Sequence, residues 1–118
     1  MLFNFRFYFS AHWCPPCRQF TQILKEFYEE SQSKGLEIIF VSSDRSAEDM
    51  YSYMKNSHGD WLALDHGCEA SQQLKQKFSI TGIPSLVVVR KDSGELITKD
   101  GRSAVQTKGP SAFQDWIE

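Results

Sequence analysis

The sequence predicts an α/β fold in which a mixed β-sheet lies between layers of helices. A strand pattern, a helix pattern and a second strand pattern follow one another between the N-terminus and Ser43. This β-α-β order implies two parallel strands joined by a right-handed crossover. Farther along, two strand patterns flank the turn motif KDSG, so a hairpin is expected to add an antiparallel pair to the sheet.

The elements of the first half follow from the spacing of apolar residues. Phenylalanine occupies every second position from Phe3 to Phe9, which is the period of a strand. An apolar helix face recurs from Phe20 to Tyr28, and Gly35 is expected to end that helix. The nearly continuous apolar stretch Leu36–Ser43 is typical of a strand that is buried on both faces.

The second half contains shorter elements. Ser46–Asp49 resembles a capping box that begins a helix, on which Met50 and Met54 are expected to be core residues. The remaining predicted elements are a short strand at Trp61–Leu64, a helix around Leu74 and Phe78, the hairpin strands Ser85–Arg90 and Glu95–Thr98, and a last helix containing Phe113, Trp116 and Ile117.

Length and composition limit the classes of protein. A chain of 118 residues suits one core, so residues 1–118 are expected to form a single domain. Hydrophobic residues make up 41% of the chain, which is more than a disordered chain contains. A net charge of −2 with mixed signs argues against direct nucleic-acid binding, which needs a dense basic patch. No apolar stretch approaches the ~18 residues of a membrane helix, and no membrane contact is expected.

The motif WCPPC, Trp13 to Cys17, combines two cysteines with a predicted helix start. Cys14 follows the first strand at the carboxyl edge of the sheet, where open α/β sheets bind ligands. A helix N-terminus favours the thiolate and lowers the pKa of a cysteine below its usual value of about 8.5. Pro15 and Pro16 suit the first turn of a helix and stiffen it. The pattern predicts thiol–disulfide exchange.

Two other interpretations of the motif are weaker. A zinc site would need two more ligands, and His12 and the HGC segment from His66 to Cys68 supply no matching spacing. A purely structural disulfide would close only a tiny loop and stabilise little. We therefore expect no metal and no organic cofactor besides a redox-active Cys14–Cys17 disulfide. Three cysteines are too few for a disulfide framework, which favours a reducing compartment, the cytosol or the nucleus.

Five segments in order resemble the thioredoxin superfamily, and within it the nucleoredoxin and tryparedoxin-like subfamily: YFSAHWCPPCRQFT, EIIFVSSDRS, HGDWLAL, GIPSLVVV and KDGR. The resemblance covers nearly the whole chain. It implies a thioredoxin-like three-layer α/β/α sandwich with a mixed sheet and a disulfide oxidoreductase activity. It also implies a cis bond between Ile83 and Pro84 beside the dithiol.

The resemblance assigns roles to residues of the motif and of the proline loop. Cys14 would be the exposed nucleophile and Cys17 the resolving thiol. The residues expected to contact substrate are Trp13, Pro15, Pro16, Ile83 and Pro84. Cys68 is expected to be a peripheral thiol.

The sequence departs from the family pattern in two respects. Relatives usually carry a β-α segment ahead of the active-site strand, so the chain looks N-terminally short, and an unpaired sheet edge would favour a weak homodimer. Thioredoxin also has a buried acid beneath its dithiol. Here Asp44 could help to deprotonate Cys17, although a turn or capping role is favoured because aspartate prefers turns.

The predicted function is a thiol–disulfide oxidoreductase that reduces protein disulfides and is recycled by an external reductase or a small thiol. By family likeness, its partners would be signalling or transcription-regulating proteins, and its location cytoplasmic and also nuclear. The alternative is a redox-sensitive binding module that holds partner proteins without much turnover.

Overall fold

The computed structural model describes residues 4–31, 37–90 and 93–109. These residues form five strands and four helices, and from β1 to β5 the order is the one that the sequence predicts. The elements are β1 (Asn4–Ser10), α1 (Pro15–Ser31), β2 (Glu37–Ser42), α2 (Ala47–Ser57), β3 (Leu62–Ala63), α3 (Glu69–Lys77), β4 (Ser85–Arg90), β5 (Leu96–Thr98) and α4 (Gly101–Lys108).

The strands form one mixed sheet in the order β3-β2-β1-β4-β5. The central strand β1 runs parallel to β2 and antiparallel to β4, and β4 and β5 form the predicted hairpin. The parallel pair and the hairpin were inferred separately from the sequence. They join into one sheet because β1 of the parallel pair lies next to β4 of the hairpin. This arrangement brings the C-terminal end of β1, where the cysteine motif begins, beside the start of β4.

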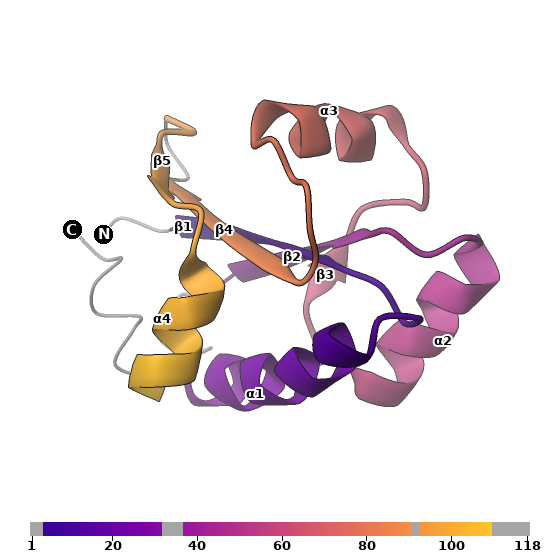
Figure 1. Cartoon of the computed structure of the whole chain (residues 1–118), viewed down its shortest axis with the longest axis horizontal. Coiled ribbons are helices and arrows are strands. Elements are labelled where there is room, and N and C mark those ends of the chain that lie inside the picture. The colour runs from indigo at the N-terminus through magenta and orange to yellow at the C-terminus, as the bar shows by residue number, and fades with distance from the viewer. Residues whose placement is uncertain (1–3, 32–36, 91–92, 110–118) are drawn as a thin grey trace.

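Helices cover both faces of the sheet, which confirms the three-layer sandwich. Figure 1 shows α1, α2 and α4 on one side of the sheet and α3 on the other. Most of the apolar face predicted for α1 is buried, with Phe20, Leu24 and Phe27 in the larger core cluster. Ile23, which the same pattern placed on that face, is 39% exposed. None of the described helices is long and apolar enough to cross a membrane.

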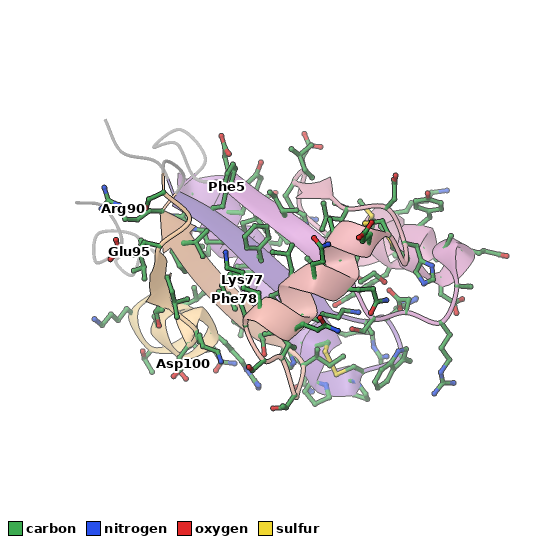
Figure 2. The ribbon with its side chains drawn as sticks, turned by 90° about the horizontal axis from the view of Figure 1, so that it is seen from above. Phe5, Lys77, Phe78, Arg90, Glu95 and Asp100 are labelled. Carbon is green, nitrogen blue, oxygen red and sulfur yellow. A yellow bond between two sulfur atoms is a disulfide. The ribbon has the colours of Figure 1, made fainter. Side chains whose placement is uncertain are left out.

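The two faces of β1 are buried to different degrees. Arg6 and Tyr8 lie on the face covered by α1 and are 0% exposed. Phe5 and Phe7 lie on the opposite face, where α3 crosses the strands, and are only partly buried (Figure 2). Burial lowers the pKa of the Arg6 guanidinium to about 9, although the negative charge of Glu37 opposes this shift. Arg6 on the polar side is therefore more deeply buried than its neighbours Phe5 and Phe7, whereas Phe9 on their face is also 0% exposed.

The last described helix, α4, occupies Gly101–Lys108, where the sequence analysis expected no helix. The helix predicted around Phe113 lies outside the described part of the chain and stays a prediction. Its sequence, GRSAVQTK, carries only Ala104 and Val105 as apolar residues, so it shows no helical stripe. Gly101 begins the helix close to β4: a Cβ atom there would lie 2.9 Å from the Leu86 carbonyl oxygen. The position of this helix therefore depends on its tertiary packing against β4, and not on an apolar stripe in its own sequence.

Candidate active site

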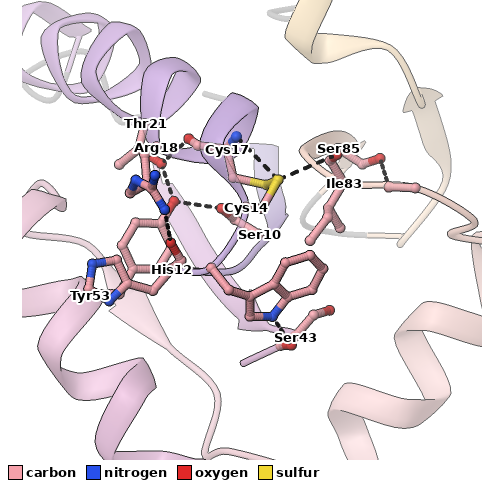
Figure 3. The surroundings of a disulfide bond; sticks show 12 residues. Ser10, His12, Cys14, Cys17, Arg18, Thr21, Ser43, Tyr53, Ile83 and Ser85 are labelled. Carbon is pink, nitrogen blue, oxygen red and sulfur yellow. Dashed lines mark hydrogen bonds between the residues drawn. A yellow bond between two sulfur atoms is a disulfide. The ribbon is translucent and has the colours of Figure 1, made fainter. Parts of the chain in front are cut away.

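The two cysteines of the motif lie at the start of α1 and are joined as a disulfide, with their Cα atoms 5.2 Å apart. The backbone N–H of Cys17 donates a hydrogen bond to Cys14 Sγ at 3.3 Å (Figure 3). Since Pro15 and Pro16 have no N–H, Cys17 supplies the first N–H of the helix, and it bonds to the Cys14 sulfur. After reduction, the same N–H group and the helix dipole would stabilise a thiolate at Cys14.

The cysteines differ in their access to solvent. Cys14 is 6% exposed, whereas Cys17 is 0% exposed. Pro15 and Pro16 are exposed, and Trp13 beside them is 50% exposed. A substrate can therefore approach Cys14 across a surface of proline and indole, while Cys17 lies beneath it.

The predicted cis peptide bond is confirmed: it joins Ile83 and Pro84. The Ile83 carbonyl oxygen lies 4.0 Å from Cys14 Sγ, and the Ile83 side chain packs against the two cysteines. A cavity of about 380 Å³ follows this loop and is also lined by Lys99 and Arg102. The tertiary structure thus brings the proline loop, distant in sequence, to the edge of the disulfide.

Trp13 is held by the loop between β2 and α2. Its indole N–H donates to the Ser43 carbonyl oxygen at 3.1 Å, and the guanidinium of Arg45 lies 5.7 Å from the ring centroid. A second cavity, of about 260 Å³, opens beside the indole and is lined by His12, Arg18, Asp44 and Asp49 along with Trp13 itself.

Asp44 lies in the loop between β2 and α2, and Ser46, not Asp44, caps α2. Asp44 is 6% exposed. Its Oδ1 accepts the backbone N–H of His12 at 2.7 Å, and its Oδ2 accepts the Ser42 hydroxyl at 2.7 Å. The carboxylate therefore bonds to the segment ahead of the motif and to its own loop.

Hydroxyl groups lie beneath the disulfide, at the place where thioredoxin has its buried acid. Thr21 Oγ1 is 2.6 Å from the Tyr8 hydroxyl and 2.5 Å from the Tyr53 hydroxyl, which in turn is 2.7 Å from Ser10 Oγ. The Cys17 carbonyl oxygen accepts from Thr21 at 2.8 Å and from Tyr8 at 3.2 Å. Burial, and next the neighbouring Tyr53, raise the pKa of Tyr8. This network consists of uncharged hydroxyl groups, and its hydrogen bonds to the Cys17 carbonyl oxygen hold the first turn of α1.

The sequence analysis did not identify these hydroxyl residues. The sequence pattern that could have identified them is the presence of polar residues at positions expected to be buried. Tyr8 and Ser10 alternate with phenylalanines, and Thr21 interrupts an apolar helix face. Cys68 remains a free thiol at the start of α3, away from this network. Among the residues described, no three His, Cys, Asp or Glu side chains gather to hold a metal ion.

Comparisons with known proteins agree with this geometry. A family model described as Thioredoxin-like matches residues 6–96. Mouse nucleoredoxin is 46% identical over 101 residues, which cover 83% of this chain and 22% of that protein. Tryparedoxin of Trypanosoma brucei brucei is 37% identical over 111 residues, which cover 92% of this chain and 76% of that protein. The crystal structure of thioredoxin from Wuchereria bancrofti superimposes with a TM-score of 0.84 at 50% identity, over 96% of this chain and 78% of that one.

The matches include both cysteines and the proline loop, since all of them lie within residues 6–96. The chain spans about a fifth, 22%, of the length of the mammalian nucleoredoxins that it matches. It spans 76% of tryparedoxin, which has a length closer to its own. The chain therefore belongs to the thioredoxin-like family of oxidoreductases, in the group that contains nucleoredoxins and tryparedoxins, and it carries a Cys14–Cys17 redox pair.

Proposed function

We propose that this chain reduces disulfide bonds in other proteins through Cys14 and Cys17. One observation carries the proposal: the disulfide lies at a helix N-terminus, and of its two cysteines only Cys14, 6% exposed, reaches solvent, whereas Cys17 is 0% exposed. Such an arrangement gives one sulfur that can meet a substrate and a second sulfur that can reach only the first.

The reaction proceeds in two exchanges. The Cys14 thiolate attacks one sulfur of the substrate disulfide, forming a mixed disulfide and releasing the other substrate sulfur as a thiolate. Cys17, as its thiolate, then attacks Cys14 Sγ, which releases the second substrate thiolate and leaves the Cys14–Cys17 disulfide. The released thiolates take up protons from water. Two electrons pass from the dithiol to the substrate.

The substrate would lie between the exposed indole of Trp13 and the Ile83–Pro84 loop, across Pro15 and Pro16. The approach of the Ile83 carbonyl to Cys14 Sγ supports this placement. A substrate segment in extended conformation could pair with the backbone of this loop, as in strand addition.

An external reductase or a small thiol would return the disulfide to the dithiol. We assign this cycle to the cytoplasm and also the nucleus, because reducing compartments favour catalytic over structural disulfides. The similarity to nucleoredoxins supports signalling or transcription-regulating proteins as partners. These partners and locations are proposals for the whole protein.

Single-cysteine variants test the proposal. Wild-type protein should reduce insulin disulfides over many turnovers. Cys17→Ser should accumulate mixed disulfides with oxidised cell proteins on a non-reducing gel, because a serine hydroxyl cannot displace a disulfide at neutral pH. Cys14→Ser should capture little, and the control Cys68→Ser should behave as wild type.

Equal trapping by the Cys14 and Cys17 variants would contradict the assigned roles. Adducts that disappear only with Cys68→Ser would move the chemistry to that thiol. If turnover is absent and a partner still binds when both cysteines of the motif are alanine, the chain is the binding module and the reductase proposal fails.

A further inference from the structure

The last residue of β2 and the start of the loop after it, residues 42–44, connect segments that are far apart in sequence. The Ser43 N–H donates to the Ser10 carbonyl oxygen at 2.9 Å, which continues the pairing of β2 with β1. The Lys75 ammonium donates to the Ser42 carbonyl oxygen at 3.1 Å from α3. His66 Nε2 lies 2.7 Å from the Asp44 carbonyl oxygen. The loop is therefore anchored to the central strand, to α3 and to the segment that precedes α3.

From this anchored loop, Asp44 holds the residue that leads into the cysteine motif. Its Oδ1 accepts the His12 N–H at 2.7 Å, and its Oδ2 is fixed by the Ser42 hydroxyl at 2.7 Å. The Asp44 N–H also bonds to Ser42 Oγ, at 2.9 Å, which fixes the carboxylate to its own backbone. A carboxylate that is nearly buried and bonded on both oxygens has little freedom to move.

His12 is held from its other side as well. Arg18, in the first turns of α1, donates to the His12 carbonyl oxygen at 2.5 Å (Figure 3). The imidazole stacks on the Tyr53 ring, with centroids 5.2 Å apart and an interplanar angle of 5°. Asp44 and Arg18 therefore fix the two ends of His12, and Trp13 and Cys14 follow directly in sequence.

We propose that Asp44 is a positioning residue for disulfide exchange: by fixing the His12 N–H, it sets how Trp13 and Cys14 Sγ face the substrate. This inference rests on the proposed reductase function. It differs from a proton-transfer role because the carboxylate bonds to His12 and Ser42, and the Cys17 N–H bonds to Cys14 Sγ. Misplacement of a reacting group by about 1 Å can cost about 100-fold in rate, so the clamp matters for catalysis.

Two substitutions separate positioning from proton transfer. Asp44→Asn keeps an oxygen that can accept the His12 N–H but removes the carboxylate, whereas Asp44→Ala removes both. We expect Asp44→Asn to retain kcat/KM for insulin reduction within about twofold, and Asp44→Ala to lose about 10- to 100-fold. Asp60→Ala is the matched control. Asp60 is an exposed aspartate, and its hydrogen bond, from the Tyr28 hydroxyl, goes to the backbone carbonyl oxygen, so the substitution does not remove it.

Two further readouts distinguish positioning from a general loss of structure. Hydrogen exchange of the His12 amide should accelerate at least tenfold in Asp44→Ala and stay near wild type in Asp44→Asn. The pH dependence of the decay of the mixed disulfide, followed in a single turnover, should be the same in Asp44→Asn and wild type. If Asp44→Ala does not fold, the Asp44→Asn variant still decides between the two roles.

The inference is overturned if Asp44→Asn is as slow as folded Asp44→Ala, or if its pH profile for mixed-disulfide decay shifts to higher pH, because both results indicate proton transfer. It is also overturned if the His12 amide exchanges equally slowly in wild type and Asp44→Ala. A wild-type protein without reductase activity contradicts the proposed function instead, and the exchange of the His12 amide then still tests the clamp.

Discussion

The two sulfurs of the motif differ because one helical turn separates a surface position from an interior one. Cys14 directly precedes α1, and its sulfur accepts the N–H of Cys17 in the first turn of that helix. Cys17 lies inside the helix above the hydroxyls of Tyr8 and Thr21, which bond to its carbonyl oxygen and do not offer a charge. Only Cys14 therefore combines access with a helix N-terminus that stabilises negative charge.

In the reduced protein, Cys14 should be alkylated before Cys17, and its pKa should lie below the usual value of about 8.5. The physical reason is the stabilisation of its thiolate by the first turn of α1. Iodoacetamide labelling at a series of pH values, read by mass spectrometry, measures both quantities. Preferential modification of Cys17, or a Cys14 pKa of about 8.5 or above, would show that the helix N-terminus does not activate this thiol.

His58 is a second residue whose behaviour depends on burial. It is 7% exposed and lies against the rings of Phe40 and Tyr53, with centroid distances of 4.4 and 4.3 Å. The Trp61 indole N–H donates to His58 Nδ1 at 3.1 Å, so this nitrogen must remain unprotonated. Burial, followed by the charge of His12, lowers the pKa of His58 from 6.5 to about 3.

The free energy of unfolding should therefore fall as the pH is lowered from about 6.5 toward 3. Above this window His58 is neutral in both states; within it, only the unfolded chain binds the proton. A single such group contributes a slope of up to about 1.4 kcal/mol per pH unit. His58→Asn keeps an acceptor for Trp61 and should show a flatter dependence in urea unfolding between pH 7 and 4. Parallel curves for both proteins would exclude His58 as the cause.

At the scale of the elements, hydroxyl groups join three segments beneath the active site. Tyr8 and Ser10 come from β1, Thr21 from α1 and Tyr53 from α2. Every member is buried, so each hydroxyl needs a partner within the protein. Tyr53 is the only contribution of α2 to these bonds, and it links Thr21 to Ser10. The network thus fixes α2 relative to the strand and the helix that frame the cysteines.

Tyr53→Phe should lower the free energy of unfolding by about 1–3 kcal/mol, because it leaves buried hydroxyls of Ser10 and Thr21 with fewer partners. Tyr51→Phe is the control, since Tyr51 lies on the same helix and is 58% exposed. Urea unfolding of the two variants measures the difference. Equal stabilities for the two variants would mean that the hydrogen bonds of Tyr53 contribute little beyond the packing of its ring.

At the scale of the whole molecule, the outer edge of the sheet beside β2 is only partly covered. The two-residue strand β3 pairs with Ile39 and Phe40 alone, and its Leu62 is 74% exposed. Short edge strands limit pairing with other chains, but an exposed leucine favours it. This edge is therefore the place where the self-association expected from the sequence would occur.

Sedimentation velocity at several concentrations should detect weak self-association of the chain, and Leu62→Lys should reduce it. The physical reason is that a lysine on an edge strand places charge where a second sheet would pair. Leu96→Lys, on the opposite edge strand β5, is the control, because Leu96 is also exposed, at 44%. Strictly monomeric behaviour of the wild type at high concentration would exclude a homodimer through this edge.

The sequence by itself determined the order of the elements from β1 to β5, the mixed sheet and the positions of the cysteines and of Pro84. These follow from local patterns, because an apolar stripe or a proline acts on its own neighbourhood of the chain. It did not reveal α4, whose short segment has no apolar stripe and packs through Gly101 and Val105.

Only the tertiary structure decided what surrounds the disulfide. Asp44 meets His12 across 32 residues, Tyr53 meets Ser10 across 43, and Ile83 meets Cys14 across 69. These contacts arise from the order of the strands, which places β2 and β4 on either side of β1. No periodicity within a segment encodes which loops meet at the end of a sheet. The chemistry of the motif is therefore local, whereas its positioning depends on the whole fold.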